Sequence, residues 1–365
     1  MARSASTPES TTVVHQGIVP AYLLTRLAQS TRFPKAADAA RQTLTVGRPP
    51  LRARIELSID ASGNLVAELS DAPDRTISDA QNTENLPGVR VRAEDDGPVA
   101  DVAVSEAFDG LGATFELLLS AFERNSLDDA GAPLDATVHF GVDYDNAFWD
   151  GSRMVFGDGD GEVFLGFTGS VSVIGHELGH GVIQYTAGLE YEGQSGALNE
   201  SIADVFGALT EQFQRGQTAD VATWLIGEGI FTDAVEGKAL RSMIEPGTAY
   251  DDEQLGRDPQ PAHMDDYVET TEDNGGVHIN SGIPNRAFAL AARELGGHAW
   301  ERAGQVWYAA LTGGLSAIAT FAEFAAATTA AAAAQYGEES EVTAAVRNAW
   351  ATVGVMADER GGSGD

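Results

Sequence analysis

A five-residue pattern at positions 176–180, HELGH, places the strongest limit on how this chain folds. It lies within VSVIGHELGHGVIQYTAG, residues 171–188, which is typical of a helix. Side chains at positions i and i+4 share one face of a helix, so His176 and His180 can reach the same zinc ion. Glu177 lies beside them and can act on a water molecule at the metal. The pattern therefore predicts a catalytic zinc site on a helix.

Three glycines, Gly175, Gly179 and Gly181, interrupt the predicted helix around this pattern. Each interior glycine destabilises a helix by about 1 kcal/mol relative to alanine. Hinge-like bending at Gly175 and Gly179 is our first interpretation. Close approach of another backbone is an equally good explanation, since a glycine leaves room for it.

Composition limits the chemistry and the partners of the chain. Its 365 residues include no cysteine, which excludes disulfides, thiolate ligands and a cysteine nucleophile. The net charge of −33 predicts repulsion of nucleic acid and of anionic membranes. This charge fits either adaptation to high salt or an ordinary acidic protein from a GC-rich genome. Peptides and proteins are therefore more plausible partners than nucleic acid or a membrane.

The start of the chain guides the expected location. Residues 1–17, MARSASTPESTTVVHQG, are polar and hold no apolar stretch typical of a secretory signal. No run in the chain approaches the ~20 apolar residues that span a bilayer. We therefore expect a cytoplasmic protein, or one exported by a non-classical route.

The pattern of apolar residues changes near residue 170, from strand-like before it to helix-like after it. Before it, residues 51–69 alternate around a Gly-Asn turn like a β-hairpin, and residues 86–98 and 135–149 are strand-like. Apolar spacing and propensity predict helices over residues 17–30, 104–126, 195–216, 280–295, 298–312, 321–337 and 341–354. The sequence therefore predicts an α+β fold with a β-rich lobe, then an α-helical lobe, and the 171–188 helix at their junction.

A catalytic zinc site requires a third protein ligand and one open position. A third histidine six residues after His180 is excluded, because Thr186 occupies that position. The next predicted helix offers Glu200, with Asp204 one turn later on the same face. Asp204 can accept a hydrogen bond from the free N–H of a ligand histidine.

Several blocks in the same order resemble the thermolysin family of zinc endopeptidases. They are residues 145–161 (DNAFWDGSRMVFGDGDG), 176–207 (HELGHGVIQYTAGLEYEGQSGALNESIADVFG), 240–243 (LRSM) and 273–285 (DNGGVHINSGIPN). The resemblance runs from about residue 100 to the last predicted helices. It implies the two-lobe thermolysin-like fold and hydrolysis of internal peptide bonds.

The resemblance also implies a role for each matching residue. Zinc would be bound by His176, His180 and Glu200. Asp204 would accept a hydrogen bond from a ligand histidine, and Glu177 would be the general base. The remaining catalytic residues would be His278 and Tyr191, which stabilise the oxyanion, and Asp273, which orients His278. Substrate main chain would bind Asn146, the backbone of Ala147, and Arg241, which would hold the carbonyl oxygen after the scissile bond.

An apolar pocket would determine specificity. The matching positions are Phe164, Phe167, Val173, Ile226 and Leu240. They imply cleavage before a bulky apolar residue. Phe167 is larger than the leucine common in the family, which would narrow the pocket.

The chain departs from the long members of the family in two places. Their double calcium site has no equivalent here, because Ser172, Thr223 and Leu225 replace carboxylates and only Glu211 and Glu228 remain. Calcium binding elsewhere stays open. Only about 50 to 75 residues precede the family-like block at residues 75–88, and residues 17–30 resemble the short prosegment of protealysin-like members.

The resulting division of the chain has four parts. Residues 1–50 are the expected prosegment, which would cover the cleft of a self-processing precursor until it is cut. Residues 51–186 form the β-rich lobe with the HELGH helix, 187–357 the helical lobe and 358–365 a flexible tail. An N-terminal helix that never leaves is the alternative to a prosegment.

Two other functions remain to be weighed. One is an inactive binding protein that keeps the fold, although every catalytic position is filled. The other is an exopeptidase, but the Gly-x-Met-Glu-Asn motif that holds a substrate amine is absent. A zinc endopeptidase is the preferred prediction.

Overall fold

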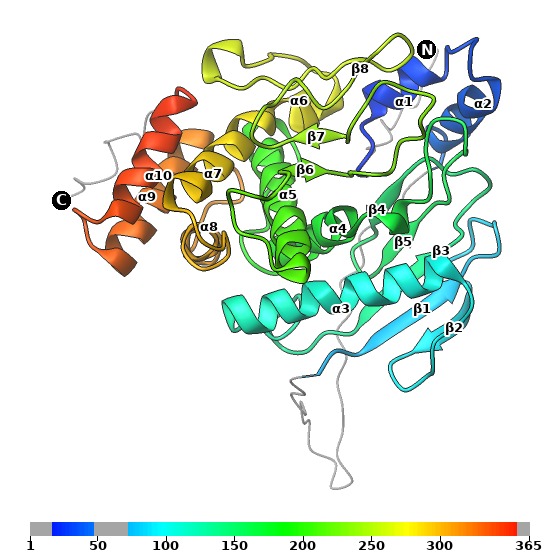
Figure 1. Ribbon diagram of the computed structural model, residues 1–365, viewed down its shortest axis with the longest axis horizontal. Helices are drawn as coiled ribbons and strands as arrows, with labels where there is room; N and C mark the ends of the chain where they lie inside the picture. The colour runs from blue at the N-terminus through cyan, green and yellow to red at the C-terminus, as the bar shows by residue number, and fades with distance from the viewer. Residues whose placement is uncertain (1–16, 47–71, 356–365) are drawn as a thin grey trace, which may run out of the picture.

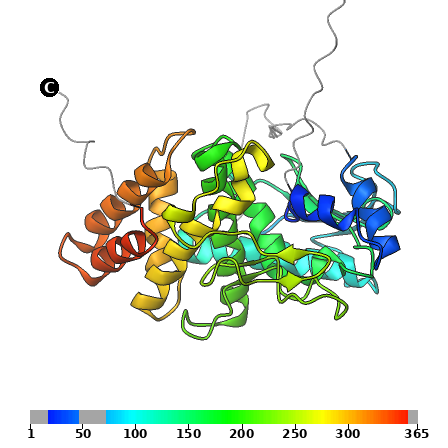
Figure 2. The ribbon, with the colours of Figure 1, turned by 90° about the horizontal axis from the view of Figure 1, so that it is seen from above.

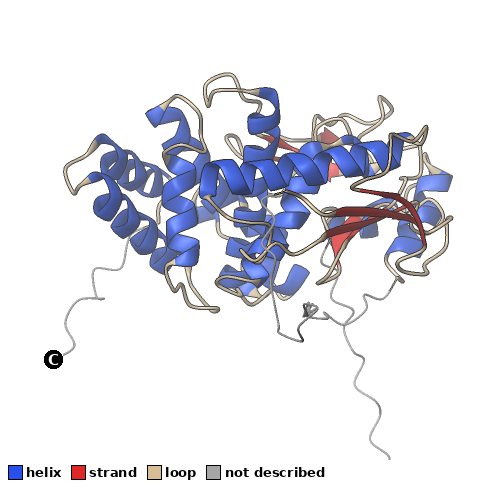
Figure 3. Ribbon diagram, turned by 90° about the horizontal axis from the view of Figure 1, so that it is seen from below, coloured by secondary structure: helices blue, strands red, loops and turns tan. Residues whose placement is uncertain are grey.

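The computed structural model describes residues 17–46 and 72–355. Residues 1–16 of the expected prosegment, the hairpin expected at residues 51–69 and the tail expected at 358–365 lie outside these residues. In the described part, the five-stranded sheet lies at one end of the molecule, and the opposite end consists of helices (Figure 3). The predicted α+β fold of two lobes is confirmed.

A five-stranded sheet forms the core of the first lobe, in the order β2-β1-β3-β5-β4. The strands are β1 (Arg75–Asp79), β2 (Val89–Ala93), β3 (Leu134–Val138), β4 (Ala147–Trp149) and β5 (Met154–Phe156). β1, β3 and β5 are parallel neighbours, and β2 and β4 pair antiparallel at the two edges. β4 therefore leaves one backbone edge open to another strand.

The long helix α3 (Val102–Phe122) packs against the sheet (Figure 1). Asp101 caps its first turn by accepting a hydrogen bond from the backbone N–H of Val104 at 3.2 Å. Its buried face consists of Val104, Phe108, Leu111, Phe115 and Leu118, at helical spacing.

Seven helices form the second half of the described chain from residue 171. They are α4 (Val171–Gln184), α5 (Gly193–Arg215), α6 (Asp273–Asn280), α7 (Gly282–Leu295), α8 (Ala303–Thr312), α9 (Phe321–Tyr336) and α10 (Glu341–Thr352). Local signals explain several of their ends, such as the Thr320–Glu323 capping box before α9 and Gly216 in a left-handed conformation after α5. Two short hairpins, β6 (Leu225–Ile226) with β7 (Arg241–Ser242) and β8 (Asp251–Asp252) with β9 (Gly256–Arg257), lie between α5 and α6.

Two helices near the N-terminus, α1 (Ala21–Leu27) and α2 (Pro34–Thr43), lie at the opposite end of the molecule from α8, α9 and α10 (Figure 2). The sequence predicted α1 but not α2. α1 buries Leu23, Leu24 and Leu27, whereas α2 is buried mainly through alanines. Alanines give little apolar contrast along a sequence, so the period of α2 is hard to detect.

The glycines of the HELGH helix serve close packing between α4 and α5. A Cβ atom on Gly179 would lie 2.9 Å from the Cα of Ala203, and one on Gly175 would lie 2.7 Å from Oγ1 of Thr210. From the other side, a Cβ on Gly207 would lie 2.4 Å from the carbonyl oxygen of Ser172. These contacts favour close packing over the hinge interpretation.

We predict that Gly179→Ala destabilises the protein, although alanine is the better helix former. Overpacking destabilises a core by about 1–3 kcal/mol, and the gain in helix propensity offsets about 1 kcal/mol of this. Urea unfolding, carried out in a Glu177→Gln background to prevent self-digestion, measures the difference. Gly97→Ala is the control, because a Cβ there would meet nothing within 4 Å. An unchanged or raised midpoint for Gly179→Ala would contradict the packing explanation.

Candidate zinc site and substrate cleft

Two facing helices bring three metal-binding side chains together. His176 and His180 lie one turn apart on α4, and Glu200 lies on α5. The Nε2 atoms of the two histidines are 3.1 Å apart. Oε2 of Glu200 lies 3.6 Å from Nε2 of His176, and its Oε1 lies 3.5 Å from Nε2 of His180. Of the described residues, only these three form a cluster with metal-ligand spacing.

Hydrogen bonds at the Nδ1 atoms of the two histidines orient their Nε2 atoms as ligands for a cation. Nδ1 of His180 donates to Oδ1 of Asn199 at 2.8 Å, and the orientation of that amide follows from its own N–H donation to Leu189. Nδ1 of His176 donates to Oδ1 of Asp204 at 2.7 Å. With both Nδ1 atoms donating, the Nε2 atoms carry the lone pairs that can bind a metal ion. Among the described residues, none donates a hydrogen bond to the buried Oε2 of Glu200. Two imidazoles and one carboxylate match the ligands of catalytic zinc sites.

The second helix, α5, also supplies Asp204, which is completely buried. Besides His176, its carboxylate accepts hydrogen bonds from Arg241 at 2.7 and 2.8 Å and from Nδ2 of Asn285 at 2.7 Å. Burial opposes ionisation, but Arg241 and then His176 hold the pKa of Asp204 well below its usual range. One ionised carboxylate therefore orients both a metal ligand and Arg241.

Glu177, which follows His176 directly in α4, contacts the edge of the sheet. Its side chain is fully buried, and Oε2 accepts a hydrogen bond of 2.8 Å from the backbone N–H of Trp149 in β4. This contact fixes the carboxylate between α4 and the edge strand. Glu177 is therefore placed beside the metal ligands, as a base acting on water requires.

Tyr191 and His278 both lie close to the carboxylate of Glu200. The hydroxyl of Tyr191 donates to Glu200 and lies 3.2 Å from Nε2 of His278. Asp273 accepts from the backbone N–H of His278 at 2.9 Å and from its Nδ1 at 2.6 Å. Burial lowers the pKa of His278, but the carboxylates of Glu200 and Asp273 outweigh it and raise the pKa to about 9.

A left-handed turn makes the Asp273–His278 contact. Asn274, Gly275 and Gly276 have φ values of 51°, 83° and 75° inside α6. Glycine adopts such a conformation without the steric cost that other residues carry. The turn folds Asp273 back onto His278, only five residues later.

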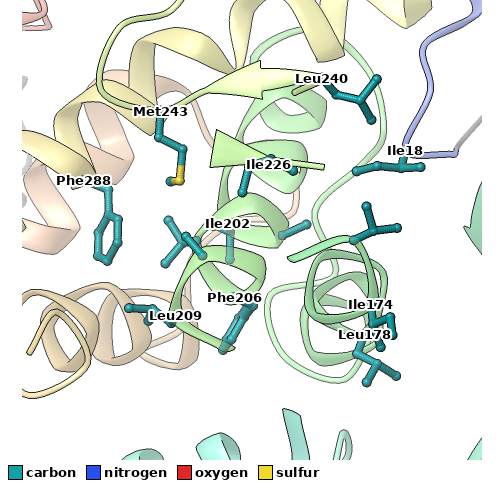
Figure 4. Packing of buried hydrophobic residues seen from close by; sticks show 14 of the residues in the cluster. Ile18, Ile174, Leu178, Ile202, Phe206, Leu209, Ile226, Leu240, Met243 and Phe288 are labelled. Atoms are coloured by element: carbon teal, nitrogen blue, oxygen red, sulfur yellow. The ribbon is translucent and has the colours of Figure 1, made fainter. Parts of the chain in front are cut away.

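The predicted substrate-binding residues line the same region. Asn146 and Ala147 lie at the start of the edge strand β4, Arg241 lies in β7, and all three are buried. The predicted apolar pocket residues are also buried; they are Phe164, Phe167, Val173, Ile226 and Leu240. Phe164 and Phe167 pack on each other, with ring centroids 5.8 Å apart. Leu240 and Ile226 belong to the β6–β7 hairpin region beside α4 and α5 (Figure 4).

Residues 17–19 of the same chain lie along these groups. The backbone N–H of Ile18 donates to the carbonyl of Ala147 at 3.1 Å, and Arg241 donates to the carbonyl of Ile18 at 3.1 Å. Val19 exchanges two hydrogen bonds with the side chain of Asn146, of 2.9 and 3.0 Å. The N-terminal segment therefore occupies the open edge of β4.

Sequence reasoning missed two residues that support the metal site, Asn199 and Asn285. Asn199 directly precedes Glu200, and Asn285 ends the last matching block, so both lay within the segments that carried the resemblance. Neither residue type binds zinc as a rule, and their role depends on contacts across 19 and 81 residues of sequence.

Comparison with known families agrees with this geometry. The profile described as "Thermolysin metallopeptidase, catalytic domain" matches residues 55–184, and "Thermolysin metallopeptidase, alpha-helical domain" matches residues 187–355. The site and the two lobes are those of a metallopeptidase. The chain belongs to the thermolysin family, and the predicted enzyme class, a metalloendopeptidase, is confirmed.

Individual relatives cover most of the chain. An "Extracellular metalloprotease" of Pectobacterium carotovorum subsp. carotovorum is 54% identical over 282 residues, or 77% of this chain and 81% of that protein. "Protease PrtS" of Photorhabdus sp. is 46% identical over 349 residues, 94% of this chain and 93% of that protein. The solved "Precursor of Protealysin, Metalloproteinase from Serratia proteamaculans" is 49% identical with a TM-score of 0.84, covering 93% of this chain and 100% of that chain.

The relatives correct the predicted location. The sequence suggested a cytoplasmic protein or export by a non-classical route, and this prediction is wrong, because the Pectobacterium relative is named extracellular. The polar composition of residues 1–17 was a poor guide, since it tests for only one kind of export signal. In the described part of the chain, no helix is long and apolar enough to cross a membrane.

We predict that Asn199→Leu weakens zinc binding by about 10–100-fold, the usual effect of removing the group that orients a ligand histidine. The substitution deletes the acceptor of His180 Nδ1 while keeping a similar volume. Competition with a chromophoric chelator, in a Glu177→Gln background, measures the affinity. Asn348→Leu on the exposed side of α10 is the matched control. Equal zinc affinity in both variants would contradict the assigned role of Asn199.

Proposed function

We propose that this chain is the latent precursor of a zinc endopeptidase that hydrolyses peptide bonds before bulky apolar residues. The observation that carries the proposal is the convergence of two imidazole nitrogens and one carboxylate, with each imidazole oriented by a hydrogen bond from its Nδ1 atom. When bound, zinc would polarise the scissile carbonyl and lower the pKa of a water molecule.

The residues of the chain would divide the remaining work. Glu177 would take the proton of the attacking water and deliver it to the departing amine. His278 and Tyr191 would donate hydrogen bonds to the oxyanion, and Asp273 would hold the ring of His278 in place. The Tyr191 hydroxyl lies 3.2 Å from Nε2 of His278, and Asp273 holds Nδ1 of the same ring, which supports this arrangement.

Substrate would bind as an added strand at the open edge of β4. Asn146 and Ala147 would bind its main chain, and Arg241 would bind the carbonyl oxygen after the scissile bond. The pocket behind this strand would accept a bulky apolar side chain. Its walls would be Phe164, Phe167, Val173, Ile226 and Leu240, all of them buried.

The division of the chain follows from the same account. Residues 1–50 would be a prosegment that inhibits its own enzyme, 51–186 the β-rich lobe, 187–357 the helical lobe and 358–365 a flexible tail. Residues 17–19 occupy the substrate edge, and hydrogen bonds of Arg26 to Gln254 and of Lys35 to Glu162 hold α1 and α2 on the two lobes, which supports an inhibitory role. A net charge of −33 supports peptides rather than nucleic acid or anionic membranes as partners.

We further propose that an arginine replaces the double calcium site of the long thermolysins. Arg215 forms an ion pair with Glu211, and its Nη1 lies 3.9 Å from Oε2 of Glu228. Ser172, which stands where the long thermolysins have a carboxylate, forms a side-chain hydrogen bond with Glu211. Burial and Glu228 raise the pKa of Glu211, and Arg215 opposes the shift. A guanidinium would thus supply the positive charge that calcium supplies elsewhere.

Glu177→Gln tests the proposed function. We predict that the variant keeps one zinc per chain, while turnover of a blocked, internally quenched peptide falls by about 10²–10⁴-fold, the contribution typical of a general base. Self-cleavage should stop as well. The control is Glu116→Gln on the exposed face of α3, which should leave turnover unchanged. Full turnover by Glu177→Gln would rule out this mechanism.

The calcium proposal has a separate test in thermal unfolding. Adding calcium should leave the unfolding midpoint of the wild type unchanged. Arg215→Gln should lower the free energy of unfolding by roughly 1–3 kcal/mol, because it leaves the buried carboxylate of Glu211 unpaired. Calcium should then restore part of the loss. Arg347→Gln, which breaks an exposed pair with Glu338, is the control. A rise of several degrees for the wild type in calcium would contradict the proposal.

A further inference from the structure

The five hydrogen bonds of residues 17–19 define a register of this segment in the cleft. Arg241 binds the carbonyl of Ile18, the position proposed for the residue after the scissile bond. Nε2 of His278 lies 3.2 Å from the carbonyl oxygen of Gly17, where the oxyanion of the residue before that bond would form. Two independent contacts therefore bracket one peptide bond, between Gly17 and Ile18.

The side chain of Ile18 agrees with this register. It is fully buried and belongs to the same hydrophobic cluster as Leu240 and Ile226 of the β6–β7 region (Figure 4). A bulky apolar residue thus occupies the place where the proposed specificity requires one. Val19, which follows it, is 1% exposed and is held by Asn146 through both its N–H and its carbonyl.

Gly17 allows an unusually close approach to the edge strand. A Cβ atom at this position would lie 2.7 Å from Oδ1 of Asn146 and 2.8 Å from the carbonyl oxygen of Ala147. Any other residue would have to lie farther out. The glycine therefore allows the carbonyl oxygen of residue 17 to lie within hydrogen-bond distance of Nε2 of His278.

We infer that the Gly17–Ile18 bond is the bond that the enzyme hydrolyses in its own precursor, and that the larger product stays in the cleft. This inference rests on the proposed function. Water adds its oxygen to the carbonyl carbon of Gly17, the C–N bond breaks, and both protons of the water pass to the nitrogen of Ile18, the first by way of Glu177 and the second from the new carboxyl group. The products are a carboxylate at Gly17 and an ammonium at Ile18.

The distribution of contacts explains why the cut does not free the cleft. Of the five hydrogen bonds, only the one between His278 and Gly17 belongs to the departing side. The other four, to Ala147, Asn146 and Arg241, hold residues 18 and 19. Beyond them, α1 buries its leucines, and Arg26 donates to the carbonyl of Gln254 at 3.2 Å. The clipped chain therefore remains latent.

Intact mass and N-terminal sequencing of the freshly purified full chain test the inference. The wild type should yield a chain beginning at Ile18, and Glu177→Gln should stay uncut. Ile18→Asp places a charge in the apolar pocket and should abolish this cut. Thr25→Asp, the same change of charge at an exposed position of α1, should keep the cut.

The activity of the product tests whether it stays latent. The chain that begins at Ile18 should hydrolyse peptide at least about tenfold more slowly than the form that has lost α1 and α2. A single contact of the bound segment worth 1.4 kcal/mol already changes its affinity for the site tenfold.

Two further measurements keep the outcomes distinct. A peptide of residues 12–25 should be cut by the activated enzyme only between Gly17 and Ile18, and its Ile18→Asp version should survive. In chelator-treated Glu177→Gln protein, Ile18→Asp should lower the unfolding midpoint and Thr25→Asp should not, which reports docking without turnover.

If an unrelated blocked peptide is hydrolysed but no terminus at Ile18 appears in chain or peptide, the inference is wrong and the proposed function stands. If no form of the protein hydrolyses any peptide, the proposed function itself fails. Full activity of the chain that begins at Ile18 would overturn the claim that the product stays bound.

Discussion

The structure of the site depends on one buried carboxylate, that of Asp204. It accepts hydrogen bonds from His176 on α4, Arg241 on β7 and Asn285 on α7, while Asp204 itself lies on α5. Four elements from both sides of the cleft are thus joined at one ionised group. Removing one partner of a buried ion pair typically destabilises a protein by about 3–5 kcal/mol. The same contacts place the proposed metal ligand His176 and Arg241, the arginine proposed to bind substrate, in fixed relation, so folding and site geometry have a common origin.

Close helix packing makes this junction possible. The glycines of α4 and Gly207 of α5 let the two backbones approach, which brings Glu200 to the histidines. The open edge of β4 lies beside the same helix, because Glu177 is bonded to the backbone of Trp149. A strand added to that edge therefore passes the metal ligands. In this chain, residues 17–19 form that added segment, which makes the prosegment both an inhibitor and a bound substrate in our account.

Motifs and periodicity predicted much of this arrangement. The HELGH pattern, the following glutamate and the colinear blocks identified the ligands. Apolar spacing identified α3 and α5, and helix propensity identified the alanine-rich α9. α2 was missed because its buried face is alanine, and the two-residue strands β6 to β9 are too short to show a period. The left-handed turn in α6 and the register of Gly17 with Asn146 depend on contacts that no local pattern records. The location was predicted wrongly, because the composition of the first residues does not report the destination of the chain.

The central claim is that two imidazoles and one carboxylate hold a single zinc ion. Zinc-edge X-ray absorption of the Glu177→Gln protein, combined with metal analysis, tests it most directly. The account predicts one zinc per chain with outer-shell scattering from two imidazoles, and loss of half of that scattering in His180→Ala. A metal-free protein that still cleaves peptides, or zinc surrounded by oxygen atoms alone, would contradict it.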